Sequence, residues 1–106
     1  MPSYMVQAAY TAEGLRGLQK DKASARKQAV TAAIEALGGR VESFHYALGD
    51  FDVVLIATMP DHVSVAALGL ATSASGMVRT KTTTLLTVEE TDQALGKQLN
   101  YRPPGG

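Results

Sequence analysis

The chain has 106 residues, of which 45% are hydrophobic and 19% charged, a length and composition typical of one globular domain. Ten Lys and Arg balance ten Asp and Glu, so the chain lacks the basic excess of nucleic-acid-binding domains, and we expect no nucleic-acid partner. The absence of cysteine excludes thiol catalysis, disulfides and thiolate metal sites.

The first half of the chain predicts a strand, a loop and a helix. Residues Tyr4–Thr11 place tyrosine and valine to alternate across a pleated strand. Two glycines interrupt Thr11–Lys20, which predicts a loop or a broken turn. A helix then begins at a cap, Asp21 or Ser24, and runs to about Leu37, where two glycines end it. Its expected apolar stripe consists of Ala29, Val30, Ala33, Ile34 and Leu37.

The second half predicts two strands joined by a turn, then a helix, a strand and a short terminal helix. The ranges are strand Arg40–Leu48, strand Phe51–Met59, helix His62–Ser75 capped by Asp61, strand Met77–Thr87 and helix Glu89–Leu99. The order βαββαβ predicts a ferredoxin-like α+β sandwich, with a four-stranded antiparallel sheet, two helices on one face and a short C-terminal helix. We take residues 1–99 as one domain and residues 100–106 as a Pro/Gly tail.

The third predicted strand is apolar at every position from Val53 to Ala57. Two helices cover only one face of a sheet, and a sheet face that contacts water normally carries polar residues at alternate positions. We therefore expect the second face to be buried as well, by another subunit or by a ligand. The pattern predicts a homodimer or a larger homo-oligomer that packs sheet to sheet.

Two carboxylates, Asp50 and Asp52, precede this apolar strand. If both side chains lie on the same face, two apart, like-charge coupling between them is one way in which a carboxylate becomes a general acid near neutral pH. For Asp50 turn chemistry is the favoured explanation, because aspartate stabilises its own backbone turn. Asp52 remains a catalytic candidate because strands disfavour aspartate, although a hydrogen bond to Thr11 or Arg16 would also account for it.

The second predicted strand carries His45 and Tyr46, whose side chains point to opposite faces. Tyr46 shares its parity with Phe44 and Leu48, which we expect to face the core. His45 shares its parity with Val41 and is expected on the open face, as a general base or as a solvated or interface residue. Tyr46 is a further catalytic candidate.

Cationic side chains suggest an anion site, with Arg16, Arg79 and Lys81 as its ligand-binding candidates. Arg79 and Lys81 share one face of the last strand, and Arg16 lies in the glycine-containing segment 11–22. If that segment folds over the open face, the three side chains would bind a small carboxylate or phosphate. Solvated charges that protect an edge strand are the alternative. The two histidines have no metal-ligand spacing, so we predict neither a metal nor a cofactor.

Four stretches of the chain resemble the GYD-domain family, whose members are related to the dimeric α/β-barrel proteins. They are Tyr10-Thr11 with Gly14-Leu15-Arg16, Gly49 with Phe51-Asp52, the segment from Ala57 to Asp61, and Val78-Arg79-Thr80. The resemblance covers about residues 3–90, and Phe51 stands where the family usually has tyrosine. It implies a ferredoxin-like fold and oligomerisation, but no assigned reaction.

The expected function is therefore that of a small cytoplasmic homo-oligomer, without a membrane span, that binds a small anionic or aromatic molecule between the open sheet face and the 11–22 loop. No complete catalytic constellation is present, so the sequence does not decide whether the protein is an enzyme. Two alternatives stay open. One is a protein that serves only for interaction or assembly, and the other is a cofactor-free monooxygenase or isomerase of the dimeric α/β-barrel type.

Overall fold

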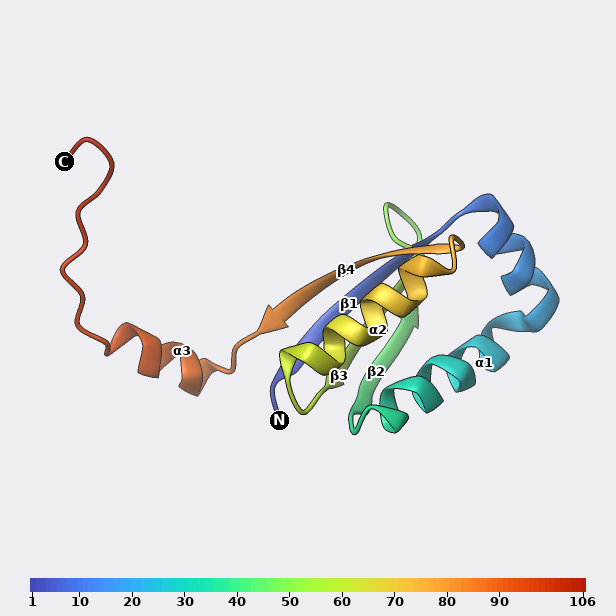
Figure 1. The fold of residues 1–106 in the computed structure, drawn as a ribbon, viewed down its shortest axis with the longest axis horizontal. Coiled ribbons are helices and arrows are strands. Elements are labelled where there is room, and N and C mark those ends of the chain that lie inside the picture. The colour runs from blue at the N-terminus through green and yellow to red at the C-terminus, as the bar shows by residue number, and fades with distance from the viewer.

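A computed structural model describes residues 1–106 and places two helices, α1 and α2, on one face of a four-stranded sheet (Figure 1). In chain order the elements are β1 Ser3–Tyr10, α1 Ala12–Ala36, β2 Arg40–Tyr46, β3 Val53–Thr58, α2 His62–Ala74, β4 Val78–Leu85 and α3 Val88–Leu95. The strands are antiparallel and lie in the order β2-β3-β1-β4. This is the predicted ferredoxin-like α+β arrangement, so the fold class is confirmed.

The register of the strands assigns each side chain to one face of the sheet. Leu55 of β3 pairs with Val6 of β1 and with Phe44 of β2, so these three side chains form one row beneath the helices. The buried core consists of Tyr4, Val6, Ile34, Leu55, Ala57, Met59, Val65 and Leu68. The opposite face, called the open face below, carries Met5, Gln7, His45, Val54 and Ile56. No helix covers the open face.

Strand β2 departs from the prediction at both ends. A bulge between Val41 and Ser43 shifts the register, so Val41 pairs with buried Ala57 on the helix side and does not share a face with His45. Leu48 is not a core residue: its exposed fraction is 104%. The reason is that β2 ends at Tyr46 and the chain turns at once, closing the hairpin before Leu48 reaches the core.

Residues 12–21 are helical, which corrects the predicted loop. Helix α1 begins after Thr11, whose hydroxyl accepts the backbone N–H of Gly14 at 3.1 Å. A Cβ atom at Gly14 would overlap the carbonyl oxygen of Met77. This glycine therefore allows the helix to approach the start of β4 closely, and does not end the helix.

Helix α1 has a kink at Lys22, where φ is 72° and ψ is 162°. A predicted helix start near Asp21 or Ser24 thus corresponds to the second part of a longer helix. Its buried stripe is narrower than expected, since Ile34 is buried while Ala29 and Ala33 are exposed. The cause is that α1 lies mainly over one strand, β2, so only one line of side chains contacts the sheet.

Residues 86–106, called the C-terminal arm below, project away from the sheet and the two helices (Figure 1). The radius of gyration is 16.8 Å, compared with about 13 Å for a compact chain of this length. Helix α3 within the arm ends at Leu95, with Gly96 as its C-cap, and is shorter than the predicted helix Glu89–Leu99. No helix combines the length and the apolar character needed to cross a membrane.

Candidate functional site

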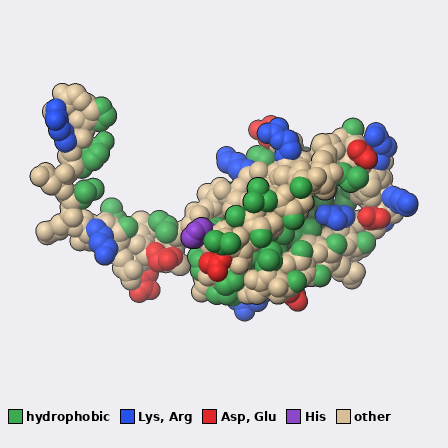
Figure 2. Space-filling model, viewed as in Figure 1, with side chains coloured by type: hydrophobic (Ala, Val, Ile, Leu, Met, Phe, Trp, Pro, Cys, Tyr) green, Lys and Arg blue, Asp and Glu red, His purple; other side chains and the backbone are tan.

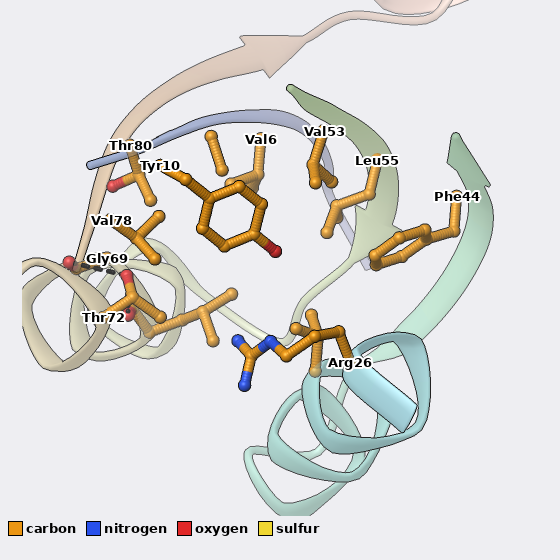
Figure 3. Close-up of a pocket in the computed structure, with 13 residues that line it drawn as sticks. Val6, Tyr10, Arg26, Phe44, Val53, Leu55, Gly69, Thr72, Val78 and Thr80 are labelled. Atoms are coloured by element: carbon orange, nitrogen blue, oxygen red, sulfur yellow. Dashed lines mark hydrogen bonds between the residues drawn. The ribbon is translucent and has the colours of Figure 1, made fainter. Parts of the chain in front are cut away.

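An apolar cavity lies between the sheet and the two helices (Figure 3). Helix α1 packs mainly on β2 and α2 mainly on β4, so the two helices leave a slot between them. Thirteen residues from both helices and all four strands line this helix-side cavity, and nine of them are hydrophobic. Its volume is about 40 Å³, room for a few water molecules at most.

Two polar side chains reach into the helix-side cavity from opposite sides. Figure 3 shows the ring and hydroxyl of Tyr10, from β1, and the guanidinium of Arg26, from α1, pointing toward its centre. The Nε atom of Arg26 is buried and has no hydrogen-bond partner, and Arg26 forms no ion pair. Buried donors are normally paired, so the Nε of Arg26 is a donor that lacks its usual partner.

A second hollow of about 250 Å³ adjoins the helix-side cavity and opens to solvent. It is called the outer hollow below. The cavity and the outer hollow share Tyr10, Arg26, Thr72 and Val78 as lining residues. The first part of α1 lines most of the remainder of the outer hollow, and Ser75 and Met77 complete it. Arg26 and Tyr10 therefore lie where a solvent-accessible entrance meets an apolar interior.

Tyr46 forms part of the wall that joins β2 to α1. Its hydroxyl donates to the backbone carbonyl of Ala23 at 3.0 Å, and its ring packs edge-on against Phe44 with centroids 5.5 Å apart. Burial raises the pKa of Tyr46, and neighbouring Tyr10 raises it further, against a lowering by Arg26. The phenol therefore stays protonated at neutral pH and serves as a hydrogen-bond donor to α1.

The Asp52 carboxylate is bound to backbone at the end of the sheet. Its Oδ2 accepts the backbone N–H of Tyr10 at 2.8 Å, which extends the pairing of β1 with β3 beyond Val53. The partner is thus Tyr10, and not Thr11 or Arg16. This contact holds the end of β1 in place beside the cavity. A catalytic role for Asp52 stays a prediction.

The other sequence candidates lie apart from one another. His45 pairs with Val54 on the open face and lines none of the hollows. Arg79 and Lys81 line a hollow of about 400 Å³ together with Asp50 and Phe51. Arg16 is exposed on α1 and is not part of that hollow, because residues 12–21 lie on the helix side. Ligand binding by these residues stays a prediction.

The sequence analysis did not place Tyr10 or Arg26 among the candidate site residues: Arg26 counted only as one of the cations in and after segment 11–22, and Tyr10 only as part of the family resemblance. A signal for each was present. Arg26 precedes Val30 by four residues and Ile34 by eight, so it is in phase with the buried stripe of α1. Tyr10 shares its parity with Val6 on the helix side of β1. A charged residue in phase with an apolar stripe is informative because charges seldom lie there without a partner. No group of three or more potential metal-ligating side chains occurs in the structure.

Comparison with known proteins identifies one family. The family model described as the GYD domain matches residues 4–95, a range that contains both sheet-covering helices, α3, Tyr10 and Arg26. No curated protein and no solved structure matches the chain.

Proposed function

Since the chain belongs to the GYD-domain family, we propose that it acts as a family member that binds a small molecule in the helix-side cavity. The ligand has an apolar or aromatic body and an anionic group. The observation that carries the proposal is the buried, unpaired Nε of Arg26 at the edge of an otherwise apolar cavity. A carboxylate that binds there would satisfy the arginine through charge-assisted hydrogen bonds, which are stronger than neutral ones.

The proposed binding place differs from the one expected from the sequence. Segment 11–22 does border it, since Gly14, Gly17, Leu18 and Asp21 line the outer hollow. That segment is helical and lies on the helix side of the sheet, however, so the ligand is placed there and not on the open face. The anionic group would enter by the outer hollow, with the apolar body between the helices.

Entry of the apolar body requires α1 and α2 to separate, because the closed cavity holds only a few waters. The packing allows this, since each helix is attached mainly to its own edge of the sheet. A rise in thermal stability with bound ligand follows, because the ligand fills the slot and joins the two helices.

The hydrogen bonds and positions of the candidate catalytic side chains favour ligand binding over catalysis. The Tyr46 hydroxyl and the Asp52 carboxylate are each engaged with backbone, and His45 lies on the other face of the sheet. No acid lines the helix-side cavity. Its polar side chains are those of Arg26, Tyr10, Thr72 and Thr80, and the Thr72 hydroxyl already donates to backbone carbonyls of α2. These groups orient an anion but form no acid–base pair.

We also propose that the protein is a cytoplasmic homo-oligomer associated through the open face. Support comes from Met5, Val54 and Ile56, which form an apolar patch on the two central strands that no element of the same chain covers. Assembly alone is the competing function, and a monomer in light scattering at micromolar concentration would contradict the oligomer. The cytoplasmic location rests on the sequence only.

The test of binding is a thermal-shift series with small aromatic and aliphatic carboxylates, each paired with its neutral amide. A carboxylate at about 100 times its dissociation constant adds about 2.7 kcal/mol to the free energy of unfolding, a rise in Tm of roughly 10 °C or more for a domain of this size. Arg26→Gln should bind about 10- to 100-fold more weakly, so at the same carboxylate concentration it should lose about half or more of this rise.

Lys27→Gln is the matched control, because it removes the neighbouring cation of α1, which is exposed on the outer side of the helix. His45→Ala is a second control, on the open face. Both should bind as the wild type does. Equal stabilisation of Arg26→Gln and wild type, or no response to any carboxylate, would overturn the proposal.

A further inference from the structure

The C-terminal arm makes no hydrogen bond to the rest of the chain. Every bond of residues 87–106 is made within the arm itself, and Figure 1 shows the arm extending beyond the end of β4. Two residues, Leu86 and Thr87, separate β4 from α3. The arm is therefore an ordered extension that its own domain does not support.

Helix α3 is well formed although it is short. The Thr87 hydroxyl accepts the Glu90 backbone N–H, and the Glu90 carboxylate accepts the Thr87 backbone N–H, both at 2.9 Å, which is a complete capping box. Helices shorter than about 12 residues are marginal in water without tertiary contacts. Helix α3 therefore has a well-defined start but no packing partner within its own domain.

The arm exposes an unusual number of large apolar side chains. They are Leu86, Val88, Leu95, Leu99 and Tyr101, each at least 62% exposed. Val88 and Leu95 are seven residues apart, so they lie on one side of α3, while Glu89 and Glu90 lie elsewhere on its surface. The helix thus has an apolar stripe that contacts nothing.

A matching surface lies on the outer side of α2. Apart from His62, α2 contains no ionisable residue, and its exposed side carries Val63 and Leu70 at 67% and 73% exposure. Figure 2 shows hydrophobic side chains gathered over this helix. Between α2 and the edge strand β4 lies a groove, called the α2–β4 groove below, lined by uncharged residues that include Ala66, Leu70 and Thr82. A helix that is apolar on both sides is normally covered on both sides.

We propose that the C-terminal arm of one copy docks in the α2–β4 groove of a second copy, and that the exchange is reciprocal. The chain has two apolar surfaces without partners, one on the arm and one on the domain. Both expose large apolar side chains, and the groove that would receive the arm is lined by uncharged residues. The arm leaves β4 in the direction of the strand, away from its own groove, which lies back along β4 beside Thr80 and Thr82.

The contact would bury the five large apolar side chains of each arm, every one of them at least 62% exposed in the single chain. Burial of apolar surface is the main driving force of protein association. The docked arm would also cover the free edge of β4, which is otherwise open to unwanted strand pairing. This inference does not depend on the ligand, which is placed on the inner side of α2.

The experiment uses the absence of cysteine in the natural chain. Leu70→Cys in the groove and Leu95→Cys on α3 are placed in separate full-length chains of different mass, which are mixed and treated with a short bis-maleimide. We expect a covalent heterodimer between the two variants as the main product. Labelling each variant with a monofunctional maleimide first establishes that its cysteine is accessible.

Lys27→Cys on the outer side of α1 replaces Leu70→Cys in the control mixture and should give little cross-linked product with Leu95→Cys. The double variant with Leu70→Cys and Leu95→Cys in one chain distinguishes exchange from folding back. A cross-linked monomer at high dilution would show that the arm covers its own groove and would overturn the proposal. A mixture in which the Leu70→Cys pair cross-links no more than the control would overturn it as well.

A second measurement tests the contact without cross-linking. Leu95→Glu and Leu70→Glu each place a charge in the proposed interface. Made in an Ile56→Glu background, which charges the open-face patch, each should increase the dissociation constant of the remaining self-association at least tenfold in sedimentation velocity. Carboxylate binding in the helix-side cavity should be unchanged in both variants, which separates a failure of this inference from a failure of the proposed function. Unchanged self-association in both variants would contradict the exchange.

Discussion

Helices α1 and α2 cover the same face of one sheet, but their outer surfaces differ. The outer side of α1 carries polar and charged residues such as Lys27, Gln28 and Glu35, which water solvates. The outer side of α2 carries Val63 and Leu70 and no charge. The inner side of each helix is explained by packing on the sheet, whereas the outer side depends on what else the helix contacts. The outer side of α1 is suited to solvent, and the outer side of α2 is the surface on which we propose that a second copy docks.

The two helices also differ along their length. Helix α1 is divided at Lys22, where a non-glycine residue has a φ of 72°, whereas α2 has no such interruption. The first part of α1 lines the outer hollow and the second part carries Arg26 toward the cavity. The kink thus allows one helix to serve both the entrance and the interior of the proposed site.

The largest expected effect concerns the inner side of α1. Ile34 is fully buried in the core, so Ile34→Ala should lower the free energy of unfolding by about 2–5 kcal/mol, through lost burial and a cavity. Urea denaturation followed by circular dichroism measures this loss. Gln28→Ala, on the outer side of the same helix, should change the free energy by no more than about 0.5 kcal/mol. Similar losses for the two variants would contradict the difference between the sides of α1.

A smaller effect separates the glycines of the two helices. Gly14 of α1 has no room for a Cβ atom, because the Met77 carbonyl occupies that space, so Gly14→Ala should destabilise by about 1–3 kcal/mol. Gly69 of α2 would place a Cβ at ordinary contact distance from Thr80. Gly69→Ala should therefore raise stability by up to about 1 kcal/mol, the usual gain in helix propensity. Thermal denaturation compares the two variants.

Gly17→Ala is the control within α1, since no atom lies within 4 Å of the added Cβ. It should behave like Gly69→Ala. A gain in Tm for Gly14→Ala would show that α1 does not approach β4 as closely as the structure indicates.

The smallest expected effect concerns the two helix starts. Thr11 caps α1 with an uncharged hydroxyl, whereas Asp61 caps α2 with a carboxylate that accepts the Ser64 backbone N–H at 2.8 Å. That hydrogen bond lowers the pKa of Asp61 below its usual value. Because the pKa of Asp61 is lower in the folded protein, its ionised carboxylate stabilises the folded state at any pH above the usual carboxylate pKa, near 4. This contribution to the free energy of unfolding is lost as the pH falls through the pKa that Asp61 has in the folded protein.

Asp61→Asn should therefore be slightly less stable than the wild type at neutral pH, and the difference should shrink below about pH 4. Thr11→Ser, the matched change at the cap of α1, should give a difference that does not vary with pH. Thermal denaturation between pH 3 and 7 measures both. A difference for Asp61→Asn that stays constant over this range would contradict the role of the charge.

Much of the fold could be predicted because it rests on local patterns. The apolar run that begins at Val53 predicted a strand, and Asp61 followed by a helix-forming stretch predicted the start of α2; both are confirmed. The prediction failed for residues 12–21, because two glycines were taken as a break. Nothing in the local sequence reveals that the backbone at Met77, more than sixty residues away, requires a glycine at position 14.

The candidate site was less accessible to sequence reasoning. Asp52 was recognised as unusual for a strand, but its partner, the backbone of Tyr10, became visible only when β1 and β3 were paired. Arg16, Arg79 and Lys81 were grouped by charge, and the structure separates Arg16 from the other two. Charge alone does not bring residues together, since long cationic side chains are solvated almost anywhere on a surface.

Periodicity and turn residues act over a few positions, so the class of fold, the family resemblance and the strand that is apolar on both faces could be predicted from the chain alone. That Tyr10 and Arg26 line one cavity, and that the C-terminal arm and the outer side of α2 are left exposed, became visible only in the folded structure. These features depend on how two helices are spaced over the sheet and on where the chain leaves β4. This spacing depends on packing between residues that are distant in sequence, so local sequence patterns do not predict it.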